Sequence, residues 1–169
     1  MAVTITPEEL YFGSPTTLTY GGVDVGGTTE PPRIIIEITK LEPDFQNAAG
    51  PVEGTSVITN VLVRCELMVN QISAAKLAWA LPGAEEAGGM ITWTAGRVPS
   101  SAYKDLVLVG QGLDGRTLTA TIENAYSAEN IELPFGKDDF TGMSMNFIGY
   151  YDPTTPMEVP FSIALAGGS

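Results

Sequence analysis

Hydrophobic and polar residues alternate with a period of two along most of the chain, which is the pattern of half-buried β-strands. The clearest stretch is Ser56–Val69, in which Thr59 is the one interruption of an apolar face made by Val57, Val61, Val63, Cys65, Leu67 and Val69. At about 3.3 Å per residue, a strand of this length spans more than ~40 Å, well beyond the usual ~five or six residues. We therefore expect it to bend around a barrel or to project beyond its own domain.

Further strands are predicted on both sides of this long one. The chain opens with a hairpin over Thr16–Gly26 that turns at Gly21–Gly22. Pro160 cannot donate a backbone hydrogen bond, so the last strand should be an edge or begin after it. Trp93 falls on the inward side of its predicted strand. The other predicted strands are Arg33–Lys40, Met90–Arg97, Asp105–Val109, Arg116–Asn124, Met143–Tyr151 and Val159–Leu165.

One short helix interrupts the strands. Its apolar residues follow helical spacing, Ser73 or Asn70 can cap its start, and Pro82-Gly83 ends it. Met1–Ser14 and Leu41–Thr55 follow neither period, and the second is an unusually long loop for a compact domain. The 169 residues fit a single, mainly β domain with one short α-helix and a long inter-strand loop. The helical stripe consists of Ala74, Leu77, Ala78 and Leu81.

The residue inventory argues against an enzyme. The chain has no histidine and one cysteine, which excludes Ser-His-Asp and Cys-His catalysis and zinc sites built from these ligands. Gly110–Gly115 matches G-x-G-x-x-G, but a dinucleotide site needs a helix next, and a strand pattern follows instead. We expect a hairpin turn there and no cofactor. Asp138 and Asp139 leave a carboxylate-dependent glycosidase or a calcium site as minor alternatives.

Aromatic residues support a binding module as the leading alternative. A monomeric β-sandwich could present a sugar-stacking face, as in a carbohydrate-binding module or adhesin, although core and interface packing explains the same residues. The candidates are Trp79, Trp93, Tyr103, Tyr126, Tyr150 and Tyr151.

The charge balance indicates whether the chain can bind nucleic acid. Twenty acidic residues against eight basic ones give a formal net charge of −12. Phosphate binding rests on Lys and Arg contacts that release counterions, so this chain is expected to repel DNA. The same charge also keeps a β protein soluble, and composition leaves both explanations open. No stretch approaches the ~20 apolar residues of a membrane span, so no membrane association is expected.

The opening segment Gly13–Gly26, with the sequence GSPTTLTYGGVDVG, resembles the first hairpin of major tail tube proteins of long-tailed, non-contractile bacteriophages. The order that follows is also similar: a strand, a long loop, a very long strand, one helix and a run of strands. The resemblance implies a tail-tube-type β-barrel or sandwich flanked by one helix. It further implies that six copies form a ring and that rings stack into a tube whose lumen conducts DNA. Contractile tails and secretion-system tubes share this fold, and the sequence does not separate them sharply.

The resemblance also assigns roles to residues. It implies that the loop contacts an adjacent ring or subunit and that residues 1–14 form an arm. Acidic residues facing the lumen would let DNA slide without binding. The implied partners are further copies of the chain and the tape-measure, tail-tip and terminator proteins, in the host cytoplasm during assembly and then in the tail of the virion. The contact residues are Glu42, Pro43, Phe45, Gln46, Pro51, Val52 and Glu53, and the possible lumen residues are Glu37, Glu66 and Glu123.

Overall fold

The computed structural model describes residues 16–43, 52–112, 115–128, 131 and 142–167. These residues are mainly β, with one short helix and a large antiparallel sheet. Hydrogen bonding runs in the order β2-β1-β7-β8-β9-β4-β3, and β10 pairs with β8 beside this path. The strands of this sheet are β1 (Thr17–Tyr20), β2 (Val23–Asp24), β3 (Arg33–Leu41), β4 (Val57–Val69), β7 (Lys104–Gln111), β8 (Thr117–Ser127), β9 (Met143–Gly149) and β10 (Phe161–Ala166).

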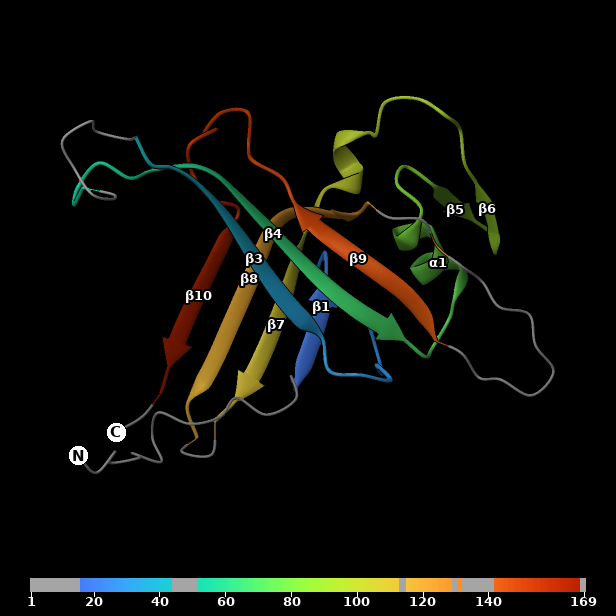
Figure 1. Cartoon of the computed structure of the whole chain (residues 1–169). Coiled ribbons are helices and arrows are strands. Elements are labelled where there is room, and N and C mark those ends of the chain that lie inside the picture. The colour runs from blue at the N-terminus through green and yellow to red at the C-terminus, as the bar shows by residue number, and fades with distance from the viewer. Residues whose placement is uncertain (1–15, 44–51, 113–114, 129–130, 132–141, 168–169) are drawn as a thin grey trace.

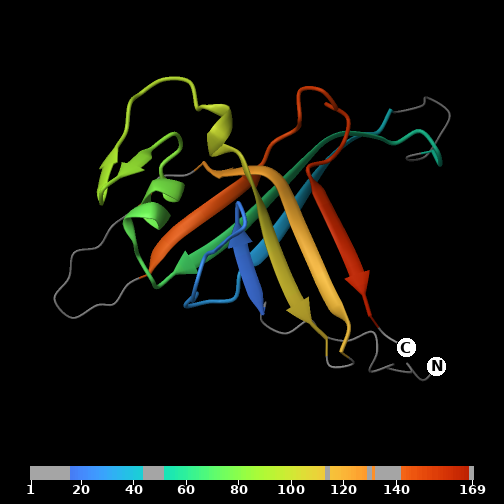
Figure 2. The same cartoon turned by 180° about the vertical axis from the view of Figure 1, so that it is seen from behind.

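The sheet folds over itself into two layers, because β8 changes partner along its length. Residues Thr117–Ile122 of β8 pair with β10, whereas Ala125–Ser127 pair with β9. Figures 1 and 2 show the result from both sides: the layer β3-β4-β9 crosses the layer β10-β8-β7-β1. Among the described strands the hydrogen bonding does not close into a barrel, so the observed form is a sandwich.

The change of partner occurs at an irregularity in β8. Asn124 has a φ of 49°, the one positive φ among the described non-glycine residues. Asparagine tolerates this left-handed conformation better than most residues do. The N–H of Asn124 donates to Asp105 Oδ1 at 3.2 Å, and the N–H of Glu123 donates to the carbonyl of Pro160 at 3.0 Å. These bonds satisfy the backbone where the ladder is interrupted, so β8 can bend from one layer into the other.

The core fills the space between the layers. The inward residues of β4 from Val61 to Val69 are buried, as the alternation predicted. Phe147 of β9 lies beside β4 in the same layer, Leu106 and Ile122 come from the other layer, and all three are fully buried. Tyr20 joins the core with its ring 4.7 Å from that of Phe147, and its hydroxyl lies within hydrogen-bond distance of the carbonyls of Ala102 and Ala125. The polar end of the ring is therefore satisfied inside the core.

Helix α1 (Ala74–Ala80) lies at one end of the sandwich, beside the small hairpin of β5 (Glu85–Ala87) and β6 (Met90–Thr92) (Figure 1). The Ser73 side chain accepts from the N–H of Lys76 at 3.3 Å, which confirms the predicted cap. No helix of the described residues is long and apolar enough to cross a membrane.

The far ends of β3 and β4 project from the sandwich on the side away from α1 (Figure 1). Residues Val57–Asn60 are exposed, and burial begins at Val61. β9 pairs with β4 only from Arg64 onward, so the first part of β4 has β3 as its one paired strand. The very long strand therefore extends beyond its own core, which is one of the two outcomes expected of it.

The sequence predictions hold for the first hairpin, for the long strand and for the start of the last strand after Pro160. Met90–Arg97 was wrong in extent: β6 ends at Thr92. Trp93, predicted to face inward, is 60% exposed and donates its indole N–H to the carbonyl of Pro82 at 2.9 Å. The strand that precedes Trp93 belongs to the separate β5-β6 hairpin and not to the large sheet, which an alternating pattern cannot reveal.

Candidate functional site

The sandwich is open on the side where β3 and β10 form its edges. Register places Ile36 and Ile38 on the same face as the buried Val63 and Val61, because directly paired residues share a face. By the same rule, Ile163 and Leu165 of β10 belong to the inner face of the other layer. These four side chains nevertheless remain 43%, 51%, 56% and 63% exposed. Inner-face hydrophobic surface that the described strands leave uncovered indicates an interaction surface.

The backbone edge of β3 is also available. Among the described strands β3 pairs with β4 alone, and the far edge of β10 has no partner. An exposed nine-residue edge strand rich in isoleucine is a template for pairing with another chain. Arg33, Glu37 and Lys40 supply charges that oppose indiscriminate pairing. We define the inner-face residues Ile36, Ile38, Ile163 and Leu165 as the open side.

The outer face of the layer β10-β8-β7-β1 carries no charged side chain over its central rows. Register aligns Ser162, Thr121, Val107 and Thr19 across four strands in one row. The next row is Ala164, Thr119, Val109 and Thr17, followed by Ala166, Thr117 and Gln111.

This run of small, uncharged side chains is unusual in a chain with a net charge of −12. We call the three rows that begin at Ser162, Ala164 and Ala166 the threonine face. Covering it costs no charge desolvation, so it suits burial against another protein surface.

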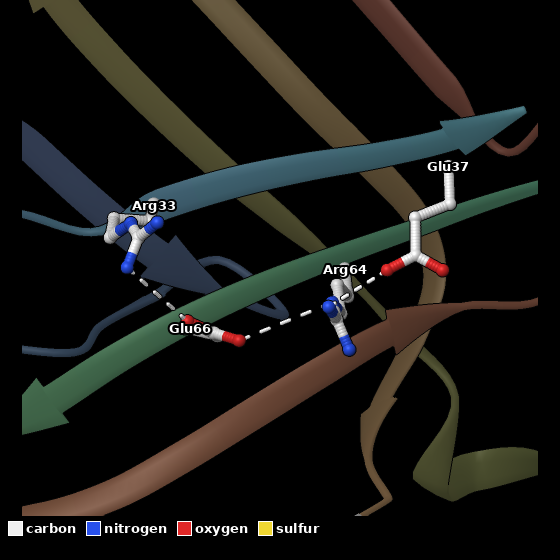
Figure 3. Close-up of polar contacts among 4 residues, drawn as sticks. All are labelled: Arg33, Glu37, Arg64 and Glu66. Atoms are coloured by element: carbon white, nitrogen blue, oxygen red, sulfur yellow. Dashed lines mark ion pairs between the residues drawn. The ribbon is translucent and has the colours of Figure 1, made fainter.

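The outer face of the other layer has a different character. Arg64 of β4 lies between two carboxylates, 2.8 Å from Glu37 and 4.0 Å from Glu66, and Arg33 lies 4.0 Å from Glu66 (Figure 3). Two cations and two anions thus alternate across β3 and β4. Glu37 and Glu66 do share one face, as a lumen wall would require, but their immediate surroundings are charge-balanced.

Glu123 lies apart from this pair. It occupies the bend of β8, beside the loop that carries Pro160, and its side chain is exposed. The three acidic residues proposed to line a lumen therefore belong to two places on the subunit. Spacing along the chain gave no indication of this separation.

The predicted contact loop begins and ends at the projecting tip, because it joins the ends of β3 and β4. Glu42, Pro43, Val52 and Glu53 are exposed there. Val52 accepts both the N–H and the hydroxyl of Thr55 at its carbonyl, at 3.2 and 2.7 Å, which forms a tight turn. Phe45, Gln46 and Pro51 lie outside the described residues, as does the arm at residues 1–14.

The aromatic residues do not form one flat surface. Trp79 packs edge-on against Tyr20, at 5.5 Å, and so supports the core. Tyr126 and Tyr150 stack at 4.6 Å with an interplanar angle of 7°, and Tyr103 meets both edge-on. Burial, followed by the hydrogen bond with Tyr126, raises the pKa of Tyr150. The tyrosines converge from three separate segments, which sequence analysis had no means to detect.

The structure gives little support to a cofactor, metal or catalytic site. The Gly-rich segment 110–115 leads from β7 into β8, so it is a strand-to-strand turn, as predicted. Asp138 and Asp139, the candidate carboxylates, fall outside the described residues. Within the described part of the chain, no three metal-ligating side chains come together. Cys65 is buried, and this burial, with a smaller effect of Glu66, raises its pKa to about 12.

Comparison with known proteins adds no identification. No protein-family model matches the chain. No curated protein matches it either. The functional argument therefore rests on the open side, the threonine face and the projecting tip.

Proposed function

We propose that this chain is a structural subunit that assembles with copies of itself into stacked rings, as the tube of a long bacteriophage tail does. The observation that carries the proposal is the open side. Exposed hydrophobic inner-face residues occur together with an edge of β3 that no described strand pairs, and a second sheet edge would cover both. A closed ring of copies satisfies such edges without leaving one exposed.

The two ends of the sandwich support a contact between rings. The described ends of the loop, residues 42–43 and 52–56, lie at the projecting tip, and α1 with the β5-β6 hairpin lies at the opposite end (Figure 1). A tip that extends beyond the core can reach a neighbouring subunit, where Val52 supplies apolar surface. The two ends consist of different elements, so a contact between the tip of one subunit and the opposite end of another is heterologous, which allows head-to-tail stacking.

The charge distribution is compatible with a channel for DNA. The net charge of −12 gives a repulsive long-range field, and the Arg64 cluster neutralises its own carboxylates instead of presenting free cations. We infer that DNA would pass such a wall without specific binding. The proposal assigns no catalytic role to any residue.

Electron microscopy of the purified protein over a concentration series tests the proposal. In the test variant, residues 42–56 are replaced by Asn-Gly, which closes a two-residue hairpin between the paired Leu41 and Val57. We expect hollow rings or tubes from the parent chain, and shortened tubes or isolated rings from the variant. Met157→Ser, which changes an exposed apolar residue outside both ends of the sandwich, is the control.

Two results would count against this function. Compact single particles at every concentration, in the presence of a preformed tail-tip complex as well, would exclude self-assembly. Tubes of equal length from parent and hairpin variant would show that the loop does not join rings.

A further inference from the structure

A cavity of about 680 Å³ opens between two loops on the side of the sandwich near the bend of β8. One loop contains the turn η2 (Ser100–Ala102), and the other follows β9. Three tyrosines and three polar side chains contribute to its lining: Tyr103, Tyr150, Tyr151, Arg97, Asn124 and Asp152. The volume lies within the ~300–1,000 Å³ typical of small-molecule sites.

The aromatic walls are held in place before any ligand arrives. Tyr126 stacks on one face of the Tyr150 ring. The parts of the ring that Tyr126 does not cover line the cavity. The hydroxyl of Tyr151 is fixed by two bonds to the backbone of Val61. Rigid rings lose little conformational entropy on binding, which is what a pre-organised site needs.

The polar groups have capacity left for a ligand. Both bonds from Thr154 reach Oδ1 of Asp152, so among the described residues Oδ2 has no donor. The Thr154 hydroxyl and N–H also hold the pKa of Asp152 below its usual value. Arg97 is exposed and forms no ion pair with a described residue. The backbone conformation of Asn124 brings an amide, both donor and acceptor, to the same cavity.

We infer that this cavity binds a neutral saccharide. A sugar ring has an apolar C–H face and a rim of hydroxyls that each donate and accept. Tyrosine rings match the face, and a carboxylate, a guanidinium and an amide together match the rim. The net charge of −12 disfavours an anionic ligand.

A peptide fits the cavity less well. Extended peptides bind chiefly through main-chain hydrogen bonds to a free strand edge. Here the walls are loops whose turn carbonyls at Pro99, Ser100, Asp152 and Thr155 already accept backbone bonds. The inference does not depend on tube assembly, since these residues lie outside the open side and the threonine face.

Isothermal titration and saturation-transfer NMR test the inference. The full chain would be titrated with glucose, galactose, mannose, N-acetylglucosamine and their β1,4- and α1,4-linked dimers. We expect at least one of these saccharides to bind. Tyr150→Leu and Asp152→Asn should each raise the Kd of that saccharide about tenfold, equivalent to about 1.4 kcal/mol. Arg97→Ala, which removes no ion pair with a described residue, should weaken binding in a chain with unchanged folding.

Trp93→Ala is the matched control, because Trp93 is an exposed aromatic residue outside this cavity. Its Kd should equal that of the parent. Failure of every saccharide to bind would overturn the inference. So would binding that Trp93→Ala abolishes, or binding that survives Tyr150→Leu and Arg97→Ala unchanged. Capture of a peptide at this cavity in place of all the sugars would overturn the assigned ligand class.

Discussion

The hydroxyl of Tyr151 occupies the place of a missing strand beside Val61. It accepts the N–H of Val61 at 3.2 Å and donates to the carbonyl of the same residue at 2.9 Å. β9 pairs with β4 from Arg64 onward, so without this side chain both backbone groups of Val61 would have no protein partner on that side. One residue therefore ends the sheet, anchors the projecting part of β4 and fixes a wall of the cavity.

Tyr151→Phe tests this dual bond. Removal of the hydroxyl leaves a partly buried N–H and carbonyl without their partner, which should lower the free energy of unfolding by about 1–3 kcal/mol. Urea denaturation of the two proteins measures the difference. Tyr103→Phe is the control, because no described residue bonds to the Tyr103 hydroxyl, and its effect should stay within about 0.5 kcal/mol. Equal effects of the two substitutions would contradict the assigned role.

Periodicity predicted most of this fold and little of its sites. The Val57–Val69 alternation gave both the strand and its buried face, since side chains on a strand must alternate. The exposure of Ile36 and Ile38 could not be predicted, because they carry the same inward pattern as Ile34, which is partly buried against the core. Only the crossing of the two layers decides which inward residues are covered. Convergence of Tyr103, Tyr126 and Tyr150 likewise depends on long-range pairing.

The Ser73 cap gives a second measurement. Helix α1 has seven residues, too few for a stable helix by propensity alone, so its first turn depends on local bonds. Ser73→Ala should cost about 1 kcal/mol in urea denaturation. Ser100→Ala is the comparison, because no side chain caps η2 and the hydroxyl there makes no described bond. A Ser73→Ala protein as stable as the parent would show that packing alone holds the helix.

The Arg64–Glu37 pair should contribute little, because both side chains are substantially exposed to solvent. A double-mutant cycle with Arg64→Met and Glu37→Gln is expected to give a coupling free energy of about 0.5 kcal/mol. Raising the salt concentration to about 1 M should reduce it further through screening. A coupling above about 2 kcal/mol that does not respond to salt would instead mark the pair as a structural element.

Alkaline pH should destabilise the fold through Cys65. Its pKa is about 12 in the folded chain and 9.0 ordinarily, so between these values the unfolded chain releases a proton that the folded chain keeps. The stabilising contribution is complete below pH 9 and is lost as pH rises toward 12. Burial raises the pKa of Tyr20 in the same direction.

Urea midpoints between pH 7 and pH 10.5 measure this effect. The parent should lose stability steadily above pH 9, and Cys65→Ala should show a shallower decline from a lower starting stability. Parallel declines in the two proteins would assign the alkaline sensitivity to other groups.

The threonine face provides the sharpest test of assembly, since a charge can be placed on it without touching the core. Thr119 lies at its centre, paired with Val109 and Ala164. If copies pack there, Thr119→Glu buries an unpaired carboxylate, a cost of several kcal/mol that no contact offsets. We expect the variant to fold, to keep its free energy of unfolding within about 1 kcal/mol of the parent's, and to form no rings or tubes by electron microscopy. Ser144→Glu is the control: it makes a similar change on the outer face of β9, and this variant should assemble as the parent does.

Normal tubes from Thr119→Glu would place the contacts between copies elsewhere. Loss of tubes from both variants would instead point to net charge as the cause.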